Sequence, residues 1–201
     1  MSIKVVNNPS KKVFEAMEAG SYAGRIYSVI HEGTVEGYQG MPQNKIRITW
    51  EFPSEMKVFK EENGEQPRVM SNEYTLSLNE KANLMAVIQA CDSKGIKIND
   101  DGYPEYDVEN LIGKTCLVEI VVKKRKDGEG DVAFISNTVA LPKGMTCGDA
   151  INPPVTLSYE NWNEELYQKL PDFLKKKIQS SKEYREMRGN HSDIPFKHER
   201  T

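Results

Sequence analysis

The sequence has few cysteines, few histidines and no long apolar run, and each shortage excludes a class of protein. Its three cysteines, Cys91, Cys116 and Cys147, are odd in number and widely spaced, which is typical of reduced thiols in a cytoplasm rather than of a disulfide framework. Apolar runs such as 117–122 are too short for a membrane span, and the first residues carry no apolar signal core. We therefore expect neither a membrane protein, nor a small secreted protein, nor a zinc module.

Motifs that carry catalysis are also missing. The sequence contains no glycine-rich phosphate loop, no His-x-x-x-His pair and no Cys-x-x-Cys pair. Asp100 and Asp101 precede Gly102, a pattern more typical of a solvated turn than of a metal site. We expect no enzymatic activity and no cofactor, because a hydrolase or nuclease would need a metal site that these residues do not supply.

Positive charge is not in excess in either part of the chain. The formal net charge is −3; residues 1–145 carry 18 Lys and Arg against 21 Asp and Glu, and residues 146–201 carry nine of each. Binding to a polyanion must therefore depend on local clusters of cations.

Alternating hydrophobicity predicts a mainly β protein. Ile46, Ile48, Trp50 and Phe52 fall on one face of a strand, and their polar neighbours fall on the other. Apolar spacing over 84–91 predicts one helix, capped by Ser77 or Asn79 and ended by Gly95 in the left-handed conformation. Strands are expected at 21–31, 45–52, 68–78, 115–124 and 132–141. The resulting β-β-β-α-β-β order is that of the OB-fold, a five-stranded, partly open barrel.

Composition divides the chain into five parts. We expect a lead-in over 1–19 with a short helix at 11–19, an OB-fold domain over 20–145, a linker over 146–157, a helical extension over 158–189 and a disordered tail over 190–201. Pro171 divides the extension into helices at about 163–170 and 171–179, and Ser180 with Glu183 is spaced to cap a third. The apolar side of these helices fits docking on the barrel, binding to a partner or self-association.

Four consecutive cations form the strongest local feature of the sequence. Lys123, Lys124, Arg125 and Lys126 come at the hairpin between the fourth and fifth expected strands. An OB barrel uses this hairpin to hold its ligand, and cations there contact phosphates. The alternative is a solvated hairpin tip whose lysines protect an edge strand from pairing.

The outward face of the expected barrel offers further contacts for a nucleic acid. Cations along a strand, combined with exposed aromatic rings, are the means by which proteins bind single strands. Trp50 is assigned to the core by its place in the alternation. The candidate contacts beyond the cationic run are Arg25, Tyr27, Tyr38, Lys45, Arg47 and Phe134.

Several segments, in their order, resemble a family of bacteriophage single-stranded DNA-binding proteins with an OB-fold. The segments are 20–22, 71–78 with 80–84, 111–114, 141–145 and 170–178 followed by Ser181 and Tyr184, so the resemblance spans residues 18–186. It implies sequence-tolerant binding of single-stranded DNA in phage replication or recombination, in the cytoplasm of an infected bacterium, with replication or recombination proteins as partners. Unlike the acidic tails of many such proteins, residues 190–201 are mixed in charge, so we do not expect recruitment through the tail. The alternative is a phage protein–protein interaction module, either a recombination mediator or a host-factor inhibitor.

Overall fold

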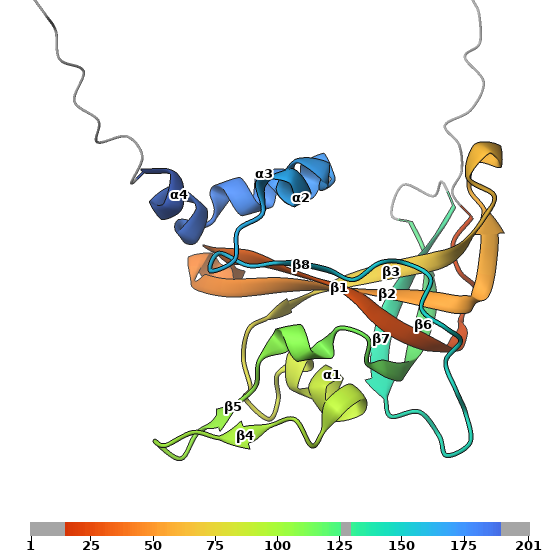
Figure 1. Ribbon diagram of the computed structural model, residues 1–201, viewed down its shortest axis with the longest axis horizontal. Helices are drawn as coiled ribbons and strands as arrows, with labels where there is room; N and C mark the ends of the chain where they lie inside the picture. Colours follow the sequence, from red (N-terminus) through yellow and green to blue (C-terminus); the bar gives the residue numbers. More distant parts are fainter. Residues whose placement is uncertain (1–14, 126–129, 190–201) are drawn as a thin grey trace, which may run out of the picture.

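A twisted antiparallel sheet forms the middle layer of the computed structural model, which describes residues 15–125 and 130–189 (Figure 1). Neighbouring strands follow the order β3-β2-β1-β6-β7, and β8 adds to β1 in parallel. The strands of this sheet are β1 (Gly20–Glu36), β2 (Pro42–Val58), β3 (Glu65–Thr75), β6 (Thr115–Lys124), β7 (Asp131–Val139) and β8 (Val155–Leu157). The prediction of a mainly β protein is confirmed.

The core lies on one face of this sheet, beneath helix α1 (Asn83–Asp92). Ile46, Ile48, Trp50 and Phe52 are at most 1% exposed, which confirms the alternation and the core position of Trp50. On α1 the buried residues are Leu84, Val87 and Ile88, the stripe that the helical spacing predicts. The helix packs against β3, β6 and β7.

Both predicted ends of this helix are wrong. The residue before α1 is Ala82, and no side chain caps the helix; Ser77 and Asn79 instead accept hydrogen bonds from the amides of Asn79 and Lys81, in the turns that lead to it. Gly95 does not have a positive φ. A Cβ at Gly95 would lie 2.5 Å from an Asp92 oxygen and 2.7 Å from the Tyr106 ring, so this glycine is required by close packing rather than by backbone conformation.

The first two strands are longer than predicted. Pairing continues through Val35↔Gln43 and Glu36↔Pro42, so the connection between the two strands comprises only residues 37–41. Gly33 makes this extension possible: the register shifts there, and its φ is +86°. Similarly, β2 passes through Pro53 with a register shift between Phe52 and Met56, and a short hairpin loop then connects it to β3.

The sheet is not closed into a barrel among the described residues. No hydrogen-bonded ladder joins β3 to β7 there, so the predicted order of five strands and one helix is present, but barrel closure is not. The connection after α1 contains a hairpin, β4 (Lys97–Ile98) with β5 (Pro104–Glu105), around the turn predicted at 100–102. Residues 15–19 are not helical, and the rest of the predicted N-terminal helix and the predicted disordered tail lie outside the described residues.

The C-terminal segment lies on the other face of the sheet, at the end where β1 turns into β2 (Figure 1). Its helices are α2 (Glu164–Lys169), α3 (Asp172–Ser180) and α4 (Lys182–Gly189). Pro171 separates α2 from α3, as predicted, but it precedes α3 instead of beginning it, and Ser181 rather than Ser180 accepts the amide of Tyr184 in α4. A second apolar cluster joins Ile30 of β1 to Leu157, Tyr167, Leu174 and Ile178. The extension is thus docked on the sheet, and the expected linker contributes a strand to it.

Within the described ranges, no helix is long and apolar enough to cross a membrane.

Candidate nucleic-acid interface

The candidate contacts predicted from the sequence separate into two regions of the sheet. Lys45 and Arg47 lie beneath the C-terminal helices, whereas Lys123, Lys124 and Arg125 lie at the end of β6, towards the opposite end of the molecule (Figure 1). Lys126 and the side chain of Tyr38 lie outside what the structure describes. The structure therefore does not bring the predicted cations together into one track.

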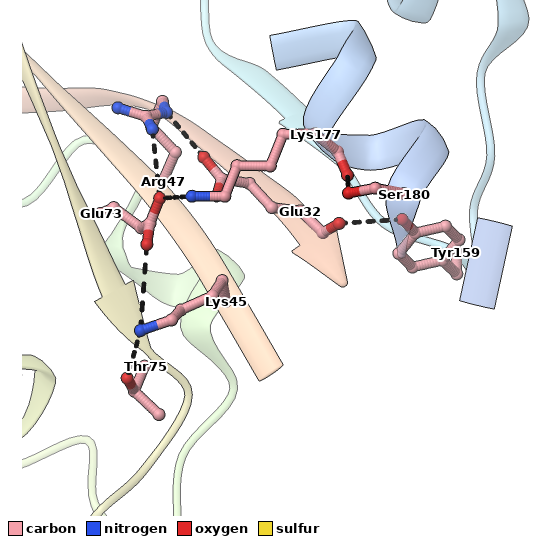
Figure 2. Close-up of polar contacts among 8 residues, drawn as sticks. All are labelled: Glu32, Lys45, Arg47, Glu73, Thr75, Tyr159, Lys177 and Ser180. Carbon is pink, nitrogen blue, oxygen red and sulfur yellow. Dashed lines mark hydrogen bonds and ion pairs between the residues drawn. The ribbon is translucent and has the colours of Figure 1, made fainter. Parts of the chain in front are cut away.

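Lys45 and Arg47 belong to a network of charges that includes two carboxylates (Figure 2). Arg47 donates from Nε to Glu32 Oε1 at 2.7 Å and lies 3.5 Å from Glu73 Oε2. Lys45 donates to the hydroxyl of Thr75 at 2.8 Å and lies 3.8 Å from Glu73. Burial lowers the pKa of Lys45, and the nearby charge of Lys177 acts in the same direction. Both cations are thus already paired with acids of the same chain.

Lys177 of α3 completes this network from the other side. Its ammonium lies 3.3 Å from Glu32 Oε2 and also pairs with Glu73. The Arg47 guanidinium lies over the ring of Phe173, 5.4 Å from its centre, while that ring is 59% exposed. The face of β2 that carries Lys45 and Arg47 is consequently part of the contact between the sheet and the C-terminal helices.

Arg25 and Tyr27 of β1 are also engaged inside the molecule. Arg25 donates to the carbonyl oxygens of Gly113 at 3.1 Å and Gly148 at 2.6 Å. Tyr27 is the extra residue at a register shift between β1 and β2, and burial raises the pKa of its hydroxyl. Next to Arg25 in the register, the buried carboxylate of Glu51 accepts three hydrogen bonds from Ile151 and Asn152. Residues 148–152 therefore cover this part of the outer face.

The cations at the end of β6 have a different environment. Lys123, Lys124 and Arg125 are all exposed, and none of them forms an ion pair with any residue that the structure describes. On the adjacent strand, Phe134 pairs with Val121 and its ring is 47% exposed. Ala133 and Ile135, on either side of it, pack against the core. This region presents accessible cations beside an accessible aromatic ring.

A cleft of about 280 Å³ opens next to these cations. It lies between residues 15–17, the arm formed by β2 and β3, and the ends of β6 and β7; its lining includes Phe59, Arg68, Val69 and Arg125. Phe59 and Arg68 are not among the candidate contacts predicted from the sequence, because the second strand was expected to end at residue 52 and the third to begin only at residue 68. The alternation of Met56 and Val58 with Lys57 was the signal that β2 continues.

Among the described residues, no group of three or more histidine, cysteine, aspartate or glutamate side chains is arranged to hold a metal ion. The comparisons with known proteins add no assignment: no family model matches the chain, and no curated protein matches it.

Proposed function

We propose that this protein binds single-stranded DNA without sequence preference, at the surface formed by the ends of β6 and β7. The observation that carries the proposal is the set of three exposed cations at 123–125, without acidic partners among the described residues, beside the exposed ring of Phe134. Lysine and arginine side chains that contact phosphates release counterions, and exposed aromatic rings stack on bases of any sequence. Because these three cations form no ion pair with the described residues, they can contact a polyanion even though the whole chain carries a net negative charge.

The order of the strands supports an OB-type barrel that is left open between β3 and β7. The succession of three strands, a helix and two strands is the one that this fold uses, and α1 contacts both β3 and β7 across the open side. In this proposal the β6–β7 hairpin takes the place of the ligand-holding loop of such barrels. The resemblance to phage single-stranded DNA-binding proteins further supports a role in replication or recombination, without catalysis.

Fluorescence anisotropy tests this function with labelled oligo-dT of about 30 nucleotides, longer than the ~4–16-nucleotide site of one OB domain. The titration is made at two salt concentrations, with a duplex of equal length as the competing ligand. We expect the single strand to bind more tightly than the duplex and to weaken as salt rises. Absence of binding at low salt would contradict the proposal and would favour the protein–protein interaction role instead.

A double charge reversal tests whether the DNA binds at the cations of residues 123–125. Lys123→Glu with Arg125→Glu is expected to lower the affinity at least tenfold and to flatten the salt dependence by about 1.4 log units per log unit of salt, the share of two phosphate contacts on a single strand. The matched control is Lys94→Glu with Lys97→Glu, which makes the same change of charge at two exposed residues near α1 and β4. Equal losses in the two variants would show that only total charge matters and would exclude the hairpin as the binding surface.

A further inference from the structure

We infer that the cleft beside the β6–β7 hairpin is a subsite for one unpaired nucleobase of the bound strand. This inference rests on the proposed function and adds to it a position for a base and a residue that stacks on it, Phe59. Neither follows from the cationic run, because Phe59 comes from the arm formed by β2 and β3.

The size and lining of the cleft fit one flat aromatic ring with polar edges rather than a longer ligand. Its volume of about 280 Å³ lies near the lower limit of ~300 Å³ for small-molecule sites. Phe59 and Val69 line it and are 41% and 45% exposed, so apolar surface is available without any rearrangement of the core. Exposure of an aromatic ring to water is unfavourable in free energy, and such a ring can stack on any of the bases.

The charges around the cleft favour a nucleotide over an apolar peptide. Arg125 and Arg68 lie in its lining, and Lys57 is close by through its ion pair with Glu15. Glu15 also lies 3.6 Å from Arg68, and these pairings lower the pKa of its carboxyl, with the hydrogen bond from Lys57 as the largest cause. Asp131 is the other acid in the lining. The lining itself thus holds two cations and two acids. Around it, Lys57 and the exposed Lys123 and Lys124, which form no ion pair with any residue that the structure describes, add three positive charges.

The position of the cleft agrees with a strand that reaches it from the hairpin. Arg125 belongs both to the cationic run and to the lining, so a phosphate held at 123–125 would place the next base at the cleft. The C-terminal helices lie over the other end of the sheet (Figure 1).

The test compares Phe59→Ala with Tyr103→Ala in the full-length protein, using the labelled oligo-dT. Tyr103 is 68% exposed and lies in the β4–β5 hairpin, so it controls for the loss of an exposed aromatic ring. We expect Phe59→Ala to raise Kd by about 5- to 150-fold, the loss of one stacked base, with an unchanged salt dependence because no phosphate contact is removed. Tyr103→Ala should leave Kd unchanged.

A crosslinking measurement distinguishes a direct contact between a base and the cleft from a loss of affinity that the substitution causes through altered folding. Oligo-dT that contains 5-iododeoxyuridine is irradiated in complex with the unaltered protein, and the attached peptide is identified by mass spectrometry. Attachment within the β2–β3 arm supports the subsite. If the protein binds oligo-dT through Lys123 and Arg125, but Phe59→Ala has an unchanged Kd or the attachment lies elsewhere, the subsite is excluded and the proposed function stands. If the unaltered protein does not bind oligo-dT, both are excluded.

Discussion

The ammonium of Lys177 in α3 lies 3.3 Å from a carboxylate oxygen of Glu32 in β1, whose side chain is fully buried. A carboxylate without a charged partner costs several kcal/mol in such a place. Two cations offset the free-energy cost of burying the Glu32 carboxylate. The docked C-terminal helices supply one of them, Lys177, and Arg47 is the other. This relationship makes α2–α4 an integral part of the folded chain.

Lys177→Met tests whether this ion pair holds the C-terminal helices on the sheet. The substitution leaves Glu32 with Arg47 alone, so we expect the free energy of unfolding to fall by about 1.5–3 kcal/mol. Urea unfolding measures the change. Lys176→Met is the control, because Lys176 is the exposed neighbour on the same helix, and its effect should stay within about 0.5 kcal/mol. Equal effects of the two variants would contradict the assigned role of Lys177.

Arg47→Gln separates a structural role from a contact with DNA. Because Arg47 neutralises Glu32 and lies over Phe173, we expect the free energy of unfolding to fall by about 2–4 kcal/mol. The Kd for oligo-dT should change less than twofold under conditions where circular dichroism shows the variant to be folded. A folded variant with a tenfold weaker Kd would show that Arg47 binds phosphate after all.

Glu183 gives the stability of the protein a specific dependence on pH. Its carboxylate accepts the amide and the hydroxyl of Thr34, both at 2.6 Å. Burial acts to raise the pKa of Glu183, but the hydrogen bonds from Thr34 outweigh it and hold the pKa below its ordinary value of 4.5. Since the unfolded chain takes up this proton first as the pH falls, the stabilisation is present above about pH 4.5 and is lost as the pH falls through the lower, folded value.

Glu183→Gln is accordingly expected to lower the free energy of unfolding by about 1.5–3 kcal/mol at neutral pH. The difference from the unaltered protein should shrink towards zero in strong acid, where the carboxyl is protonated in both states. Urea unfolding across this pH range measures it. Glu165→Gln, at an exposed position on α2, should have little effect at any pH. A difference that stays constant with pH would mean that the charge of Glu183 is unimportant.

Trp50→Phe tests the assignment of the indole to the core. Trp50 is fully buried among the residues beneath α1, so a smaller ring leaves a cavity, and we expect a loss of about 1–2 kcal/mol, less than the ~3–5 kcal/mol of truncation to alanine. The affinity for oligo-dT should not change, because the indole cannot reach a base. A weaker Kd in a variant of unchanged stability would reverse this assignment.

Local patterns in the sequence were sufficient to predict several of the main strands and helices and which side of β2 is buried. Alternation over 45–52 predicted which side of β2 is buried, because successive side chains of a strand point to opposite faces. Pro171 predicted the break between α2 and α3, because proline restricts the residue before it and favours a first helical turn. The end of β6 and its exposed cations also followed from a short stretch of sequence, in which the cationic run comes between the strands expected at 115–124 and 132–141.

Tertiary structure alone decided which of the predicted contacts are accessible. The alternation correctly placed Lys45 and Arg47 on the outer face of β2, but it carries no information about Glu32, Glu73 and Lys177, which meet them there. Likewise, the cleft at Phe59 exists because residues 15–17 and two hairpins distant in sequence come together. A pattern of period two determines the direction of a side chain, whereas its partners depend on which strands pair and on how distant segments pack. Strand pairing brought Glu32 and Glu73 to Lys45 and Arg47, and the packing of α3 covered that site with Lys177. By contrast, Lys123, Lys124 and Arg125 form no ion pair with any residue that the structure describes.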